Sequence, residues 1–225
     1  MGLAPRERIV VLVVSKMKPG KLIVLEGING CGKGTQLHYL VGLIHRADKS
    51  STVFVTREPN DFDENGRKAR EMLKSDGDPY DNAIEAVKYF AKNREAHNHI
   101  FIPMLNRGIH VLSDRYWHSN FAFQGAQGID GQDILDANRS ARKPDLTLIL
   151  DVPVEVAFDR LYRRDGEVRR KFDGNLEFLG RVRQNYLGLS EILSNEKIVV
   201  INGNQDVGAV REAVKFAYDS IFKSS

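Results

Sequence analysis

The sequence predicts an α/β fold with three layers, in which a mostly parallel five-stranded sheet carries helices on both faces. Two observations lead to this prediction. Short apolar, β-branched runs without polar alternation are typical of strands that are covered on both sides, and longer stretches with helical spacing lie among them. The expected strands are Leu22–Leu25, Thr52–Val55, Ile109–Leu112, Leu146–Leu150 and Ile198–Ile201.

Three stretches outside these runs repeat apolar residues at intervals of three and four, which places the residues on one face of a helix. The first stretch follows the first strand, the second precedes the third strand, and the third precedes the fifth. The apolar positions are Leu37, Leu40, Val41 and Ile44, then Ile84, Val87, Phe90 and Ala91, then Leu176, Leu179, Val182, Tyr186 and Leu189. Helices that alternate with strands favour a parallel sheet.

The composition is that of an ordinary globular chain, with 225 residues of which 42% are hydrophobic and 28% charged. It excludes collagen-like and wholly disordered proteins. No internal repeat and no Pro- or Ser-rich linker divides the chain, so we expect residues 20–225 to form a single domain. We expect residues 1–19 to be a dispensable N-terminal extension, although Val10–Val14 is apolar enough for an edge strand.

Several classes of function are disfavoured by what the sequence contains. No apolar run approaches the roughly 18 residues that span a bilayer, so no membrane partner is expected. The single cysteine, Cys31, excludes an intramolecular disulfide framework and a Cys-cluster zinc site, and fits a reducing, cytoplasmic setting. The formal net charge of +3 is too small to argue for nucleic-acid binding.

The most informative segment is Gly27–Thr35, which reads Gly-Ile-Asn-Gly-Cys-Gly-Lys-Gly-Thr. It follows the first strand and opens a helix, as the G-x-x-x-x-G-K phosphate loop requires. Its glycines let backbone N–H groups turn towards a phosphate, while the helix dipole and Lys33 add positive charge. The alternative is a tight turn without a ligand. We expect ATP to contact Gly27, Asn29, Gly30, Cys31, Gly32, Lys33, Gly34, Thr35 and Gln36.

From about Lys21 onwards the chain resembles the thymidylate kinases, which are P-loop nucleoside-monophosphate kinases. Five motifs in order carry the resemblance: Glu26–Gln36, Thr56–Pro59, Tyr89–Arg94, Asp114–Gly125 and Pro144–Pro153. The resemblance implies a P-loop kinase fold, ATP and Mg²⁺ as cofactors, transfer of phosphate from ATP to dTMP, and a cytoplasmic homodimer. The chain departs from the family at Asn29, where Asp is usual, and at Gly34, where Ser is usual.

Three residues at strand ends are candidates for the phosphate chemistry. The resemblance assigns Arg57 to the phosphate of dTMP, whereas the residues alone also allow a surface pair between Arg57 and Glu58. Asp114 follows an apolar run, where an acidic side chain can orient Mg²⁺ directly or through water, or cap the next helix. Arg115 is expected to face the phosphates and to assist the transfer.

The expected base pocket begins with Phe90 and Arg94, which are four residues apart and share a helix face. Spacing alone favours a core Phe beside an Arg whose head reaches solvent. The resemblance implies instead that Phe90 stacks on the base and that Arg94 donates to O4 of thymine. It also implies that Asn120 reads the N3–H edge, that Phe123 contacts the sugar, and that Gln124 lines the pocket.

A basic stretch is expected to form a lid over ATP at about residues 160–173, with Arg163–Phe172 as a loop between two helices. Family members with Gly at the position of Gly30 carry their catalytic arginine in this lid. Arg164 and Arg169 are the candidates for that role. Arg160 is expected to stack on adenine, and Asn202 to lie at the edge of the same base.

Three other functions remain as alternatives. The chain could phosphorylate another acceptor, such as UMP, CMP, dUMP or a deoxynucleoside. A nucleotide-binding protein without catalysis is kept open by Asn29 and Gly34. A GTPase switch is disfavoured because no Asn/Thr-Lys-x-Asp segment is present.

Overall fold

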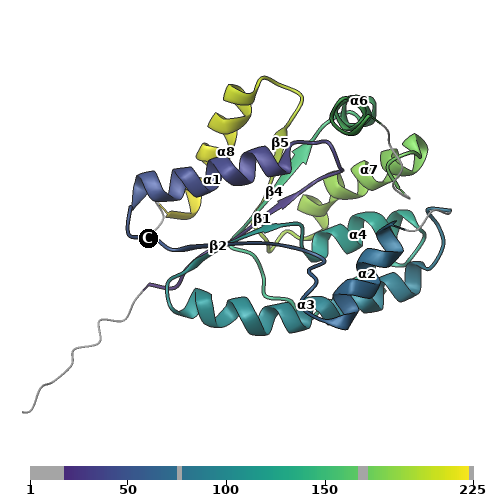
Figure 1. The fold of residues 1–225 in the computed structure, drawn as a ribbon, viewed down its shortest axis with the longest axis horizontal. Helices are drawn as coiled ribbons and strands as arrows, with labels where there is room; N and C mark the ends of the chain where they lie inside the picture. The colour runs from purple at the N-terminus through teal and green to yellow at the C-terminus, as the bar shows by residue number, and fades with distance from the viewer. Residues whose placement is uncertain (1–17, 75–77, 167–171, 223–225) are drawn as a thin grey trace, which may run out of the picture.

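The computed structural model describes residues 18–74, 78–166 and 172–222. Five parallel strands form one sheet in the order β2-β3-β1-β4-β5 (Figure 1). The strands are β1 (Leu22–Glu26), β2 (Val53–Arg57), β3 (His110–Asp114), β4 (Leu146–Asp151) and β5 (Ile198–Asn202). All five predicted strands are confirmed. Each continues past its apolar run into a polar or charged residue at its carboxyl end, where the predictions from hydrophobicity had stopped.

Helices cover both faces of this sheet, which confirms the three layers (Figure 1). Helices α1 and α8 pack on one face, and α3 and α7 cover the other, with α4 in contact with both α3 and α7. The helices are α1 (Lys33–Ala47), α2 (Glu64–Lys74), α3 (Ala83–Asn106), α4 (Trp117–Ala126), α5 (Gly131–Ala137), α6 (Val154–Asp165), α7 (Leu176–Ile192) and α8 (Val207–Phe222). None of the helices in the described ranges is long and apolar enough to cross a membrane.

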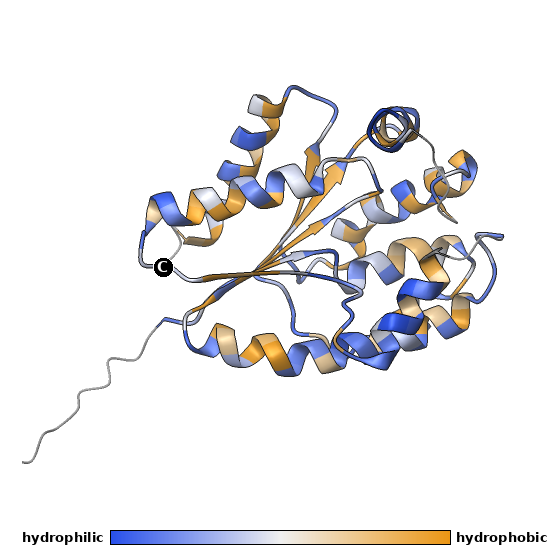
Figure 2. Ribbon diagram, in the orientation of Figure 1, coloured by the Kyte–Doolittle hydropathy of each residue, from blue (hydrophilic) through white to orange (hydrophobic). Residues whose placement is uncertain are grey.

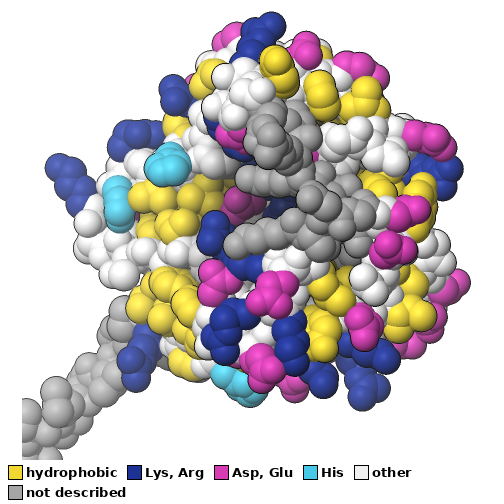
Figure 3. All heavy atoms as spheres, turned by 45° about the vertical axis from the view of Figure 1, so that its right-hand side comes forward, with side chains coloured by type: hydrophobic (Ala, Val, Ile, Leu, Met, Phe, Trp, Pro, Cys, Tyr) yellow, Lys and Arg dark blue, Asp and Glu magenta, His cyan; other side chains and the backbone are white. Residues whose placement is uncertain are grey.

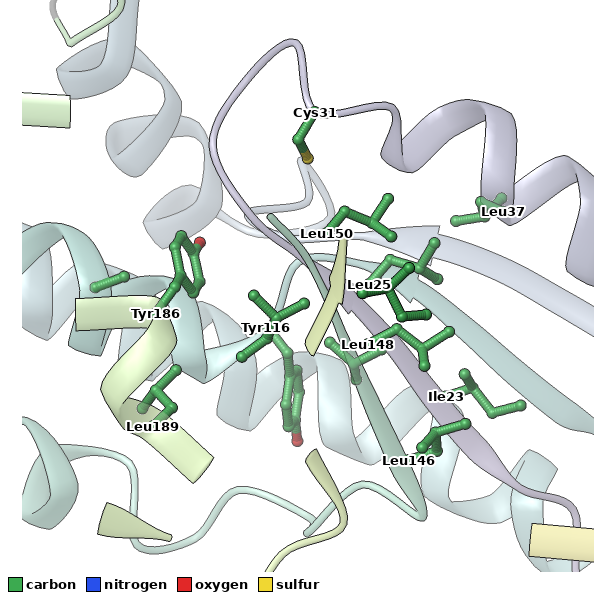
Figure 4. Close-up of a cluster of buried hydrophobic side chains, with 14 of the residues drawn as sticks. Ile23, Leu25, Cys31, Leu37, Tyr116, Leu146, Leu148, Leu150, Tyr186 and Leu189 are labelled. Carbon is green, nitrogen blue, oxygen red and sulfur yellow. The ribbon is translucent and has the colours of Figure 1, made fainter. Parts of the chain in front are cut away.

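The core lies around the central strands, because those strands are covered on both faces. Leu22–Leu25 of β1 has no exposed surface, and most of β4 is equally buried, which explains runs without polar alternation. Strands β2 and β5 lie at the edges of the sheet, where Val55 and Val200 are exposed. Figure 2 shows apolar strands between helices that carry both polar and apolar residues, and Figure 4 shows Leu25 of β1 and Leu148 of β4 in the same buried cluster as Leu37 of α1.

The three predicted helical stretches form α1, α3 and α7, but two of the expected core positions are wrong. Ile84 is 62% exposed and Leu176 is 43% exposed. Both residues lie in the first turn of their helices, although Ala83, one residue before Ile84, is buried. Periodicity identified the buried face of each helix but not the exposure of single residues in its first turn.

The basic stretch differs from the predicted loop because α6 continues to Asp165. Arg160, Arg163 and Arg164 therefore belong to a helix, which ends at Gly166 with a φ of 73°. Glycine adopts this left-handed conformation readily. Arg169 and Val10–Val14 lie outside the described residues, so the boundaries of the lid and of the N-terminal extension remain predictions.

The order of the strands places the loop after β1 at the point where ligands bind to open α/β sheets. Strand β1 pairs with β3 on one side and β4 on the other. The connection after β1 runs to β2 on one side of the sheet, whereas the connection after the neighbouring β4 runs to β5 on the other. Ligands occupy the crevice beyond the carboxyl ends of the strands at such a switch point. The registers pair Asp114 with Leu25 and with Arg57, so the polar ends of β1, β2 and β3 meet at this edge.

Candidate active site

The loop between β1 and α1 is held in a conformation that requires glycine. Gly27 has a φ of 128°, and a Cβ atom there would lie 2.6 Å from the carbonyl oxygen of Leu150. Gly32 has a φ of 103° and precedes α1 without any side chain that caps the helix. The first N–H groups of α1 therefore lack a side-chain acceptor at the cap, which is the arrangement that binds anions at helix N-termini.

Lys33 lies inside this loop and is only 6% exposed. Its Nζ donates to the carbonyl oxygens of Gly27 at 3.0 Å and Ile28 at 3.1 Å, and lies 3.8 Å from Sγ of Cys31. No carboxylate of the described chain lies within ion-pair distance of it. A buried ammonium that is satisfied only by neutral oxygens attracts an anion strongly, because it has already lost its hydration.

The remaining loop residues differ in exposure. Gly34 and Thr35, at the start of α1, are exposed, and a Cβ atom on Gly34 would meet nothing within 4 Å. Gln36 is buried, and its Oε1 has no hydrogen-bond partner. The Thr35 hydroxyl is therefore accessible beside the loop. Oε1 of Gln36 is free to accept a hydrogen bond there.

A cavity beside the loop brings together every residue that the sequence predicted for the acceptor. Asn29 and Asp114 also line it, with Phe172 and Asp173 from the segment before α7. On the face in Figure 3, Lys and Arg side chains are interspersed with Asp and Glu, so positive charge does not form one uniform surface. The acceptor residues that line the cavity are Arg57, Phe90, Arg94, Arg115, Asn120, Phe123 and Gln124.

Arg94 is buried and neutralised rather than directed to solvent. Its Nε donates to Oε2 of Glu58 at 2.7 Å, and its guanidinium lies 5.2 Å from the ring centre of Tyr116. Only 2% of Arg94 is exposed. His97 also contacts Glu58, at 3.0 Å. The alternative of an Arg94 that reaches solvent is therefore wrong, and so is the alternative of an Arg57–Glu58 pair.

A chain of side-chain amides, which we call the amide relay, continues from Arg94 along α4. Arg94 donates to Oδ1 of Asn120 at 2.8 Å, Asn120 donates to Oε1 of Gln124 at 2.9 Å, and Gln124 donates to Oε1 of Gln127 at 2.9 Å. Gln127 in turn donates to the backbone carbonyl of Pro79. Because a guanidinium only donates and a carbonyl only accepts, both ends of the relay fix the orientation of every amide between them.

Arg115 occupies a strained backbone position beside the loop, with a φ of 74°. Its guanidinium donates to Oδ1 of Asn29 at 2.7 Å, to the Tyr186 hydroxyl at 3.0 Å and to the Ser119 hydroxyl at 3.2 Å. Burial alone would lower the pKa of Arg115, but nearby Tyr186 and the carboxyl group of Asp114 outweigh burial and raise it. Arg115 therefore stays charged although its partners are formally neutral.

Glu26 organises the side of the site that faces α4 and α7. Its buried carboxylate accepts from the backbone N–H of Tyr116 at 2.7 Å, from Ser119 at 2.7 Å and from the Tyr186 hydroxyl at 2.9 Å. Burial raises the pKa of Tyr186 and keeps its hydroxyl protonated. Since Ser119 and Tyr186 also contact Arg115, the same hydrogen bonds hold the guanidinium at the edge of the sheet.

Asp114 presents an unsatisfied oxygen at the end of β3. Its Oδ1 is buried without a hydrogen-bond partner, and the residue lines the cavity. Helix α4 begins after Tyr116 and has no side-chain cap, so the expectation that Asp114 caps this helix is wrong. Within the described ranges, no group of three or more His, Cys, Asp or Glu side chains is arranged to hold a metal ion.

Of the residues predicted to hold adenine or to supply the lid arginine, Arg160, Arg164 and Asn202 do not line the cavity, and Arg169 lies outside the described residues. Arg160 donates to the carbonyl oxygen of Gly203 at 3.2 Å, next to the exposed Asn202. Arg164 is exposed and pairs with its neighbour Asp165 at 2.7 Å. Arg160 and Asn202 are thus brought near one another, while Arg164 is not brought to the phosphate loop.

Sequence reasoning missed the residues that support the site rather than line it. Glu58 and Asn138 hold Arg94, Tyr186 holds Arg115, and Asp173 accepts from Asn29. Glu58 lay inside a quoted motif but was considered only as a partner for Arg57. No spacing rule links the others to the site, because each comes from a separate element that the fold brings close.

Comparisons with known proteins match most of the chain to one family. The thymidylate kinase family model matches residues 25–214. A probable thymidylate kinase of Thermococcus kodakarensis is 35% identical over 199 residues, which cover 85% of this chain and 94% of the relative. The thymidylate kinase of Nitrosomonas europaea is 36% identical over 202 residues, which cover 88% of this chain and 92% of the relative.

Gly27→Ala is expected to destabilise the protein, because the new methyl group meets the Leu150 carbonyl and a φ of 128° disfavours any side chain. We expect a loss of roughly 1–3 kcal/mol in the free energy of unfolding, measured in urea. Gly34→Ala is the matched control: its Cβ meets nothing within 4 Å, and alanine is favoured in a helix. Equal urea midpoints for the two variants would contradict the strained-loop geometry.

Proposed function

This chain belongs to the thymidylate kinase family, and we propose that it transfers the γ-phosphoryl group of ATP to dTMP to give ADP and dTDP. The observation that carries the proposal is a set of three cations around one edge of the sheet: the Lys33 ammonium and the guanidinium groups of Arg57 and Arg115. None of them has a carboxylate within ion-pair distance in the described parts of the chain, whereas Arg94, in the same cavity, is paired with Glu58.

The three cations suit the two phosphate groups that must meet for the transfer. Lys33 and the N–H groups of the glycine loop hold the β- and γ-phosphates of ATP. Arg57 holds the phosphate of dTMP, and Arg115 lies between the loop and the cavity, where charge spreads over the transferred group. Phosphoryl transfer needs positioning and neutralisation of charge more than covalent chemistry, and these residues supply both.

The aromatic and neutralised polar side chains of the cavity suit a pyrimidine base. Phe90 supplies a flat apolar surface for stacking, and Phe123 faces the sugar. The unshared hydrogen-bonding capacity of Arg94, Asn120 and Gln124 reads the polar edge of the base. Because Arg94 is already neutralised by Glu58, it serves as a fixed donor and does not compete with Arg57 for the phosphate.

Magnesium fits the oxygen that Asp114 leaves without a partner. A buried carboxylate oxygen with no hydrogen bond is a suitable ligand for Mg²⁺, directly or through water. Asp114 would hold the ion. Gly34 stands where the family usually has Ser, so the serine hydroxyl that usually contacts the ion is missing. When bound, the ion neutralises charge on the phosphates of ATP.

We assign the adenine side of ATP to Arg160 and Asn202, which lie together at the end of β5. A lid arginine, Arg164 or Arg169, supplies a further positive charge to the transferred group when ATP is bound. We also propose that the chain acts as a cytoplasmic homodimer in dTTP synthesis, without nucleic-acid or membrane partners. These assignments rest on the family resemblance.

An acceptor panel tests the proposed reaction. Wild-type protein is incubated with ATP, Mg²⁺ and one of dTMP, dUMP, UMP, dCMP, CMP or thymidine, and ADP release is measured. We expect dTMP to give the highest kcat/KM. Faster turnover of another acceptor would reassign the substrate, and ATP binding without acceptor-dependent ADP release would favour the non-catalytic alternative.

Lys33→Ala is expected to reduce kcat with dTMP by roughly 100-fold or more, because the variant lacks a charge that stabilises the transferred group. The carbonyl oxygens of Gly27 and Ile28 lose a donor, but the substitution also removes the cost of burying a charge, so we expect the variant to fold. Lys49→Ala, at an exposed position, is the matched control and should retain wild-type turnover. Near-normal kcat for Lys33→Ala would exclude the loop from the reaction.

Arg57→Ala is expected to raise the KM for dTMP by roughly 10- to 100-fold, since a charge-assisted bond to phosphate contributes about 1.5–3 kcal/mol. The KM for ATP and the melting temperature should change little, because the exposed side chain of Arg57 makes no hydrogen bond or ion pair within the described chain. Arg139→Ala, at another exposed arginine, is the control. Equal increases in both KM values would remove Arg57 from the acceptor side.

A further inference from the structure

The side chain of Asn29 connects two parts of the site that are far apart in sequence. Its Nδ2 donates to both carboxylate oxygens of Asp173, at 2.9 and 3.1 Å, across 144 residues. Its Oδ1 accepts from Nη2 of Arg115 at 2.7 Å, across 86 residues. These contacts form a continuous bridge from the segment before α7, through the phosphate loop, to the guanidinium of Arg115. We call it the Asn29 bridge.

Asp173 depends on this bridge. It is 1% exposed, and the only hydrogen bonds that its carboxylate makes within the described chain come from Asn29. A buried carboxylate is costly unless hydrogen bonds compensate for its lost hydration. The adjacent Phe172 stacks on Phe178 with ring centres 5.2 Å apart, and this fixes the position from which Asp173 reaches the loop.

The hydrogen-bonding groups of Arg115 and Asp173 determine which side chain at position 29 can connect them. A guanidinium offers only donors, and an ionised carboxylate offers only acceptors. The residue in the middle must therefore accept from Arg115 and donate to Asp173 at the same time. An amide does both, whereas an ionised carboxylate at position 29 would face Asp173 without a proton to share.

We propose that Asn29 is a positioning residue that fixes the Arg115 guanidinium at the phosphate loop, and that Asp173 acts on Arg115 through Asn29. This inference rests on the proposed function, because it concerns how Arg115 is held for phosphoryl transfer. The bridge also predicts that the two ends can exchange roles. With Asp at 29 and Asn at 173, the carboxylate accepts from Arg115 and the amide of residue 173 donates to that carboxylate.

The exchange is tested with Asn29→Asp, Asp173→Asn and the double variant. We measure kcat and both KM values with ATP and dTMP, and the melting temperature without substrate. Asn29→Asp should reduce kcat by roughly tenfold, more than it changes either KM, and should lower the melting temperature. The double variant should recover the melting temperature and should raise kcat roughly threefold above Asn29→Asp; recovery of kcat is partial because the carboxylate at position 29 now pairs with Arg115. Asn195→Asp adds the same charge at an exposed site and should change neither quantity.

Other outcomes would contradict either the bridge or the positioning role of Asn29. A double variant that is no better than Asn29→Asp in melting temperature excludes the bridge. A recovered melting temperature without recovery of kcat makes the bridge structural and overturns the positioning role, as does an unchanged kcat for Asn29→Asp. If wild-type protein does not phosphorylate dTMP, the proposed function fails. The melting temperatures still test the bridge, and kcat is then measured with the acceptor that the panel identifies.

Discussion

The site depends on positive side chains that the protein keeps close together without neutralising them. Lys33 is buried against carbonyl oxygens, and Arg115 is held by an amide and two hydroxyl groups. Like charges repel one another, and buried charges are costly, so such an arrangement reduces the stability of the empty protein. A bound anion removes that cost. The parallel sheet makes the arrangement possible, because the carboxyl ends of its central strands meet at one edge.

Two arginines of the cavity, Arg94 and Arg115, show how partners determine what one residue type does. Arg94 forms an ion pair with Glu58, which neutralises its charge inside the protein. Within the described chain, the hydrogen-bond partners of Arg115 are neutral, so no ion pair cancels its charge. A ligand with an anionic end and a neutral, polar end suits this arrangement in one orientation. In the complex that we propose, the base faces the neutralised arginine, while the phosphate faces Arg57 and Arg115.

The sequence predicted the strands because buried parallel strands are continuous apolar runs, and it predicted the cavity residues because ordered motifs mark them. It did not predict their partners. Glu58 and Arg94 are 36 residues apart, and Asn29 and Asp173 are 144 apart, so no local periodicity relates them. The end of α6 was also missed, because charged residues in a last helical turn have the same composition as a loop. The exposure of Ile84 shows that a periodic pattern identifies a face without giving its depth.

The amide relay gives the base pocket a direction. Each amide in it has its oxygen towards Arg94 and its nitrogen towards Pro79, and no single member can turn over without breaking contacts on both sides. A nucleobase whose edge has donors and acceptors in the reverse order would require every amide of the relay to exchange its oxygen and nitrogen. The guanidinium of Arg94 cannot make that exchange, because it has only donors. Discrimination between bases with opposite edges would thus be a collective property of four residues, so changing one contact alone would weaken it without reversing it.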